Sequence, residues 1–193
     1  DWTVLDISEK MGAEIPEGIK FICCNAENVK LPDRSFDFII IRSVLEYTNE
    51  DLVLNEAKRL LKEEGYFVLA QKVMDGYSSD INLILELERL RNPLKKNLGF
   101  MSNLVKQVAK TGLRILNSRT YTQNYSINFD KWLSRNDTIN LENQVKLKKI
   151  ITSLNEDVIQ RTGLKLVNNV LYSNLTWAII TCHKNSYVNP NTS

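Results

Sequence analysis

Short apolar runs alternate with polar stretches along the first seventy residues. Four runs rich in β-branched and aromatic residues have the length of buried strands, and they lie at 2–8, 18–26, 35–43 and 66–73. Residues 49–64 instead space their apolar side chains as one stripe of a helix, with a cap at Thr48 or Asn49 and Gly65 just past the end. Strands that alternate with helices over short links predict a mostly parallel sheet wound by helices. The residues expected to be buried in this sheet are Val4, Phe21, Ile39, Ile40 and Val68.

After residue 74 the pattern becomes mainly helical. Two helices, the first stopped by Pro93 and the second followed by Gly112, predict a helical insertion at about 77–111. The later elements are expected as a strand at 113–122, a short helix at 128–135, a helical segment at about 139–162 and a strand at 175–184. We therefore predict one α/β domain over 1–184 and a flexible tail over 185–193.

The composition narrows the possible function classes. Hydrophobic residues make up 43% and charged residues 25% of the 193 residues, and the net charge of +2 gives no reason to expect a nucleic acid as partner. No apolar run reaches the ~18 residues of a membrane span, and the first residues lack the pattern of a signal peptide. Three cysteines without ligand spacing predict reduced thiols and no metal site, which is typical of a cytoplasmic protein. Cys23 and Cys24 are expected to pack within their strand.

Ordered sequence motifs between Val4 and Lys72 carry a specific resemblance. In chain order they read DISEKM, NAENVKLP, SFDFIIIRSVLEY and EAKRLLKEEG. This run resembles the class I, seven-stranded, S-adenosylmethionine-dependent methyltransferases, most of all the ubiquinone/menaquinone-biosynthesis type. The resemblance implies a Rossmann-like α/β fold with a doubly wound, mostly parallel sheet and a helical insertion. It also implies S-adenosylmethionine as cofactor and S-adenosylhomocysteine as product.

By this resemblance, Asp6 is expected to bind the ribose hydroxyls of the cofactor. Asp6 ends the first predicted strand, and ligands of open α/β sheets lie beyond the carboxyl ends of the strands. Ile7 and Met11 are then expected near the adenine. An alternative is that Asp6 caps the short helix that follows it, and the two roles are compatible.

The second predicted strand ends at a turn that the resemblance places around the adenine. Asn25 stands where the family usually has aspartate, so its amide oxygen can still accept a hydrogen bond but the charge is lost. Ala26 would supply a backbone N–H donor, and Glu27 lies alongside. The alternative role for Asn25 is that of a plain turn residue after a strand.

The third predicted strand leads to the residues expected nearest the transferred methyl group. The resemblance implies that Arg42 and Ser43 border the methionine part of the cofactor and that Glu46 and Tyr47 line the substrate pocket. Glu46 has an alternative role as a first-turn acid of a helix. Methyl transfer requires orientation and exclusion of water more than one particular side chain, so no catalytic residue is assigned. The single histidine, His183, is expected to be a strand-end residue rather than a base.

One motif of the family is missing, namely the N-terminal strand with its glycine-rich turn. We expect the sheet position between 2–6 and 35–41 to be filled by an N-terminal extension or by a second chain. Otherwise two rows of backbone N–H and C=O groups would stay unpaired. The expected function is methyl transfer to a small-molecule acceptor. The alternative is a non-catalytic methyltransferase-like subunit that stabilises or regulates a partner chain.

Overall fold

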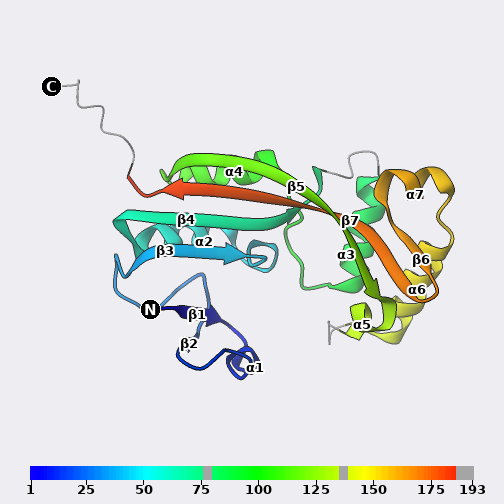
Figure 1. The fold of residues 1–193 in the computed structure, drawn as a ribbon, viewed down its shortest axis with the longest axis horizontal. Coiled ribbons are helices and arrows are strands. Elements are labelled where there is room, and N and C mark those ends of the chain that lie inside the picture. Colours follow the sequence, from blue (N-terminus) through cyan, green and yellow to red (C-terminus); the bar gives the residue numbers. More distant parts are fainter. Residues whose placement is uncertain (76–79, 135–138, 186–193) are drawn as a thin grey trace.

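The computed structural model describes residues 1–75, 80–134 and 139–185, which form two sheets with helices packed against them (Figure 1). The predicted tail over 185–193 lies almost wholly outside the described residues. The smaller sheet is the parallel pair of β1 (Thr3–Asp6) and β2 (Lys20–Cys23), joined through α1 (Glu9–Gly12). The larger sheet has the order β3-β4-β7-β5, with β6 added beside β7. Its strands are β3 (Phe36–Arg42), β4 (Leu61–Val73), β5 (Arg114–Asn128), β6 (Lys165–Val167) and β7 (Val170–His183).

Strand direction in the larger sheet follows the sequence prediction. β3 and β4 pair in parallel and are linked through the 3-10 turn η1 (Leu45–Tyr47) and α2 (Glu50–Leu60). β7 pairs antiparallel with β4, β5 and β6, so among the described strands of this sheet β7 alone runs against the others. The predicted Rossmann-like α/β class with mostly parallel strands is confirmed.

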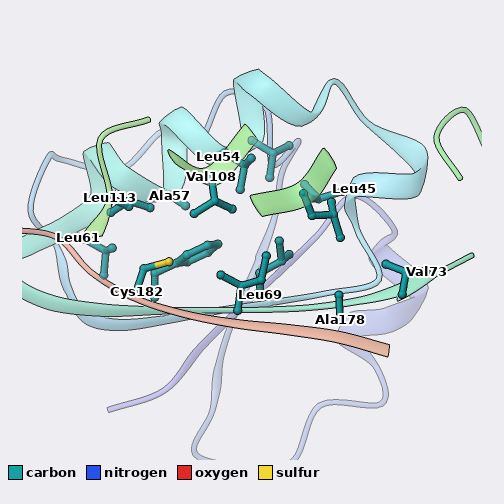
Figure 2. Close-up of a cluster of buried hydrophobic side chains, with 14 residues drawn as sticks. Leu45, Leu54, Ala57, Leu61, Leu69, Val73, Val108, Leu113, Ala178 and Cys182 are labelled. Atoms are coloured by element: carbon teal, nitrogen blue, oxygen red, sulfur yellow. The ribbon is translucent and has the colours of Figure 1, made fainter. Parts of the chain in front are cut away.

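The main hydrophobic core lies between this sheet and two helices. α2 and α4 (Met101–Lys110) cover one face of β4 and β7. Figure 2 shows Leu54 and Val108 of these helices above Leu69 and Cys182 of the strands. Cys182 is fully buried, and this burial raises the pKa of its thiol to about 11. The thiol is therefore protonated and inert at neutral pH.

A second core lies at the far end of the two longest strands. The predicted strands cover only 113–122 and 175–184, but pairing between β5 and β7 continues to Asn128 and Val170. Three helices pack around that extension: α3 (Ile81–Arg91), α5 (Phe129–Ser134) and α6 (Leu141–Thr152). A fourth helix, α7 (Glu156–Thr162), leads into β6. No helix in the described ranges is long and apolar enough to cross a membrane.

α2 is shorter than the sequence pattern predicts. Its cap is Asn49, whose side-chain oxygen accepts a hydrogen bond from a backbone N–H of the first turn. The helix ends at Leu60 rather than at Glu64, because Leu61 turns into extended backbone, is fully buried and pairs with Phe36 of β3. Strand pairing and burial therefore override helix propensity in this segment.

Two packing predictions are wrong. Ile40 is 53% exposed, and Phe38 and Tyr66 on the same sheet face are exposed as well. This face lies opposite the one that α2 and α4 cover, because neighbouring residues of a strand point to opposite sides. Cys23 is exposed rather than packed, since β2 pairs only with β1 in the described chain. The other residues expected to be buried are half-buried: Val4, Phe21, Ile39 and Val68.

Candidate cofactor-binding site

A groove of about 380 Å³ separates the two sheets. Residues 1–6, including all of β1, form one wall, and most of β3 forms the other. In the described chain these two strands do not pair with each other. Apolar side chains of α2, among them Val53 and Ala57, also reach the groove. The lining along the strands is therefore mainly apolar.

Three of the predicted cofactor residues line the carboxyl end of this groove. They are Asp6 after β1, Ala26 after β2 and Arg42 at the end of β3. The strands β1 and β2 are parallel, and β1 and β3 point the same way in Figure 1, so their carboxyl ends meet at one edge. The fold thus brings together side chains that are far apart in sequence.

Asp6 combines its position at the groove with a role in a turn. Its Oδ1 accepts a hydrogen bond of 2.8 Å from the backbone N–H of Ser8, which is the residue that caps α1. The Ser8 side chain makes no capping hydrogen bond of its own. Asp6 therefore stabilises the turn that leads into α1, but the alternative that Asp6 itself caps this helix is wrong, because the N-cap is Ser8. A carboxylate has several acceptor positions, so this hydrogen bond is compatible with a ligand at the second oxygen.

The Asn25–Glu27 turn is held by its own polar groups. Asn25 Oδ1 accepts from the backbone N–H of Glu27 at 2.9 Å, and the Asn25 carbonyl accepts from Asn28 N at 3.1 Å. Glu27 Oε1 accepts from the backbone N–H of Asn49 at 2.8 Å and so ties the turn to the start of α2. Asn25 thus has the turn role that its position also predicts. Ala26 lines the groove, whereas Asn25 and Glu27 do not.

Ile7 and Met11 lie on the surface outside the groove lining, and Ile7 is 73% exposed. Arg42 places its guanidinium carbon 6.0 Å from the centre of the Trp177 ring. The next residue, Ser43, has φ +54 and donates its backbone N–H to Ala70 O at 3.1 Å. This left-handed conformation is uncommon for a residue with a Cβ, and such strain concentrates at ligand sites.

Glu46 belongs to a buried cluster of charges rather than to the groove. Lys95 Nζ lies 3.2 Å from Glu46 Oε2 and 2.7 Å from Glu88 Oε2, and Glu88 also pairs with Lys72. The side chains of Lys95, Glu46 and Glu88 are each less than one-tenth exposed. Glu46 is the acid in the first turn of η1, whereas the acids in the first turn of α2 are Glu50 and Asp51. The Glu46 carboxylate is therefore held by Lys95 and is not free to act as a base.

Tyr47 borders the same cluster. Its hydroxyl accepts a hydrogen bond of 3.1 Å from Asn92 Nδ2. Burial, and after it the neighbouring Glu46 carboxylate, raises the pKa of Tyr47. The phenol is therefore protonated at neutral pH and can donate a hydrogen bond, but it is a poor base.

Sequence reasoning did not identify Lys72, Glu88 or Lys95. These residues come from β4, α3 and the segment after α3, so no short spacing connects them. One local signal was present: Glu88 follows Ile84 by four positions on the buried stripe of α3. An acid on an apolar stripe indicates a buried partner of opposite charge.

His183 lies at the opposite end of the sheet. It pairs with Tyr66 near the start of β4, and the two rings meet edge to face at 4.9 Å. Arg42, at the site, instead pairs with Ala70 farther along β4. His183 is thus a buried strand-end residue, as the sequence predicts, and it lies at the end of the sheet opposite to Arg42.

We expect the charge cluster to make the fold sensitive to acid. Burial alone would raise the pKa of Glu88, but attraction to Lys72 and Lys95 outweighs it and holds the pKa far below the ordinary 4.5. The stabilisation is therefore complete above the pKa of the unfolded chain and is lost as the pH falls below about 4.5. Urea unfolding between pH 7 and pH 3 measures this loss. Glu88→Gln should weaken the pH dependence, and an identical pH dependence in both proteins would contradict the assignment.

Comparisons with known proteins agree with this architecture. Residues 1–69 match the family model described as Methyltransferase domain. A protein of Bacillus halodurans C-125, provisionally named as a methyltransferase, superposes with a TM-score of 0.76 at 15% identity, over 95% of this chain and 83% of that one. The YcgJ protein of Bacillus subtilis gives a TM-score of 0.74 at 19% identity, over 96% and 82%. At these identities the likenesses show the fold.

A sequence relative extends the comparison to an archaeon. An uncharacterized protein of Methanocaldococcus jannaschii is 33% identical over 101 residues, which are 51% of this chain and 47% of that protein. The chain thus spans about half the length of this curated relative.

Proposed function

Because residues 1–69 are methyltransferase-domain sequence and the chain has the Rossmann-like fold of class I methyltransferases, we propose that it transfers a methyl group from S-adenosylmethionine to a small-molecule acceptor. The observation that carries the proposal is the meeting of Asp6, Ala26 and Arg42 at one end of one groove. A carboxylate can accept hydrogen bonds from ribose hydroxyls, an apolar side chain can pack against an adenine, and a guanidinium can pair with an amino-acid carboxylate.

Five of the predicted cofactor residues have a role in this proposal. The Asp6 carboxylate accepts hydrogen bonds from the ribose hydroxyls, and Ala26 packs against the adenine. Ile7 and Met11 supply apolar surface that is exposed beside the end of β1. Arg42, at the opposite wall of the groove, attracts the carboxylate of the methionine part. When bound, S-adenosylmethionine supplies an activated sulfonium methyl group and leaves as S-adenosylhomocysteine.

The acceptor side is formed by the segment after β3. Tyr47 is 36% exposed and protonated, so it can orient a polar acceptor by a hydrogen bond. Glu46 and Lys95 pair with each other beneath it, and this pair fixes the position of η1. The near-neutral net charge of +2 favours a small molecule over a nucleic acid. The acceptor's proton passes to solvent, because no residue of the cluster is a free base.

Isothermal titration of the natural polypeptide with S-adenosylhomocysteine tests the proposal. We expect one site per chain, and no measurable heat with ATP, which shares the adenosine but has a triphosphate in place of the amino-acid end. Release of S-adenosylhomocysteine during incubation with S-adenosylmethionine and candidate acceptors then reports on transfer. A chain that binds neither S-adenosylmethionine nor S-adenosylhomocysteine would instead support a non-catalytic subunit.

A further inference from the structure

The segment between α3 and α4 holds η1 in place. The backbone N–H groups of Lys96 and Asn97 donate to the Glu46 carbonyl at 2.7 and 3.3 Å. The Asn97 side chain adds two hydrogen bonds, from Nδ2 to Leu45 O at 3.0 Å and to Thr48 O at 2.8 Å. A short 3-10 turn satisfies few of its own carbonyl groups, so η1 needs such partners. The position of η1 therefore depends on a side chain that lies 49 to 52 positions farther along the sequence.

A second asparagine of the same segment holds the side chain of Tyr47. Asn92 is 9% exposed, and its Nδ2 donates to the Tyr47 hydroxyl at 3.1 Å. Asn92 Oδ1 accepts from the backbone N–H of Leu94 at 3.1 Å, and this contact fixes which end of the amide faces the phenol. The backbone N–H of Asn92 donates to Glu88 O at 2.9 Å, which attaches the residue to the end of α3. The Tyr47 oxygen is thus held by a buried and well-anchored donor.

The hydrogen bonds of the Tyr47 phenol determine what it can offer to a ligand. Burial, the charge of Glu46 and a hydrogen bond with the Glu46 carboxylate raise the pKa of Tyr47. A hydrogen bond that favours the protonated phenol is one in which the O–H donates, so the Tyr47 proton is directed at Glu46. A phenol oxygen also accepts hydrogen bonds, and Asn92 already donates one. The oxygen can accept one more, so a ligand that binds there must supply the donor.

We propose that Asn92 and Asn97 are positioning residues for methyl transfer, which hold Tyr47 so that its oxygen accepts a hydrogen bond from an O–H or N–H group of the acceptor. This inference rests on the proposed function and narrows the acceptor to a molecule whose reacting oxygen or nitrogen carries a hydrogen. Tyr47 is 36% exposed, so a ligand can approach it.

A hydrogen bond of this direction suits the transfer step. It orients the reacting atom through its hydrogen and leaves the lone pair of that atom free to face the methyl carbon. The lone pair forms the new bond to the methyl carbon, and the C–S bond breaks with its electrons remaining on sulfur. The acceptor's proton then leaves to solvent.

The contact between Asn92 and Tyr47 can be measured without an acceptor. In the natural polypeptide labelled with 13Cζ-tyrosine, the NMR signal that is absent from Tyr47→Phe belongs to Tyr47. Asn92→Leu, which has a similar size but no N–H group, should shift this signal and leave those of the other tyrosines in place. Asn103→Leu is the matched control, because Asn103 is an exposed residue of α4. An unshifted Tyr47 signal in Asn92→Leu would mean that Asn92 does not hold the phenol, and the proposal would be wrong.

Kinetic measurements test whether the two asparagines serve the reaction. With an acceptor found through release of S-adenosylhomocysteine, Asn92→Leu and Asn97→Ala should each lower kcat/KM for the acceptor by roughly 10- to 100-fold, because small displacements at a reacting centre are costly. Asn97→Ser keeps one donor, so it should lose less, and it replaces Asn97→Ala if that variant does not fold. The affinity for S-adenosylhomocysteine should stay unchanged, since neither asparagine lines the groove. Asn103→Leu should change neither quantity.

A double variant separates positioning from a structural role. If Asn92 acts through Tyr47, adding Asn92→Leu to Tyr47→Phe should cause no further decrease in kcat/KM, whereas independent effects would multiply. Multiplying effects, or a lower affinity of Asn92→Leu for S-adenosylhomocysteine, would overturn the proposal. Turnover of an acceptor whose reacting atom carries no hydrogen, such as a tertiary amine, would do so as well. Absence of S-adenosylhomocysteine binding in the unaltered chain would instead refute the proposed function and this inference with it.

Discussion

Replacing Lys95 by methionine is expected to lower the free energy of unfolding by about 3–5 kcal/mol, because it leaves a buried carboxylate without its partner. Lys95 bridges Glu46 and Glu88, and its side chain is 4% exposed. Glu88 keeps Lys72 in the variant, whereas among the described residues Glu46 is left with neutral neighbours, namely Tyr47 and Gln71, whose Nε2 is 3.5 Å away. Urea unfolding followed by circular dichroism measures the loss.

Two further variants separate this effect from a general loss of charge. Lys146→Met removes a 3.0 Å pair with Glu86 in which both side chains are about half exposed, so the loss should stay below about 1 kcal/mol. Glu46→Gln added to Lys95→Met removes the unpaired charge and should recover part of the lost stability. If Lys95→Met and Lys146→Met lower the free energy of unfolding equally, burial does not explain the contribution of the cluster to stability.

Replacing Asp6 by alanine is expected to weaken binding of S-adenosylhomocysteine by about 2–4 kcal/mol, since two charge-assisted hydrogen bonds to the ribose are lost. Calorimetric titration of both proteins measures the difference. Glu9→Ala is the control, because Glu9 is a nearby exposed acid on α1 and its loss should leave the affinity unchanged.

An asparagine at the same position distinguishes the two roles of Asp6. Asp6→Asn keeps an oxygen that can accept from the Ser8 N–H, so the turn into α1 and the Tm should be preserved. Its affinity for the ligand should nevertheless fall, because the charge is lost. If Asp6→Asn binds as tightly as the unchanged protein, Asp6 is only a turn residue and the ribose assignment is wrong.

Most of the fold could be predicted from local patterns. The strand end at Asp6 and a cap at Thr48 or Asn49 follow from periodicity and capping, which involve residues close together in sequence. The structure then selects Asn49 as the cap and ends β3 at Arg42. Longer elements were less predictable. β5 and β7 extend beyond their apolar segments because each supplies the other's hydrogen bonds, and this pairing is not visible in either strand alone.

Part of the candidate site could likewise be predicted from the sequence, and part could not. Sequence motifs alone identified Asp6, Ala26 and Arg42, since a resemblance that fixes strand ends also fixes which residues lie at the edge of a parallel sheet. Only the tertiary structure could show that Lys95 pairs with Glu46 and Glu88. A buried charge requires a partner of opposite charge, and here the partners come from segments that are distant in sequence. Only the tertiary structure could likewise show that Ile40 is exposed. Periodicity determines which face of a strand a side chain occupies, whereas burial depends on what covers that face.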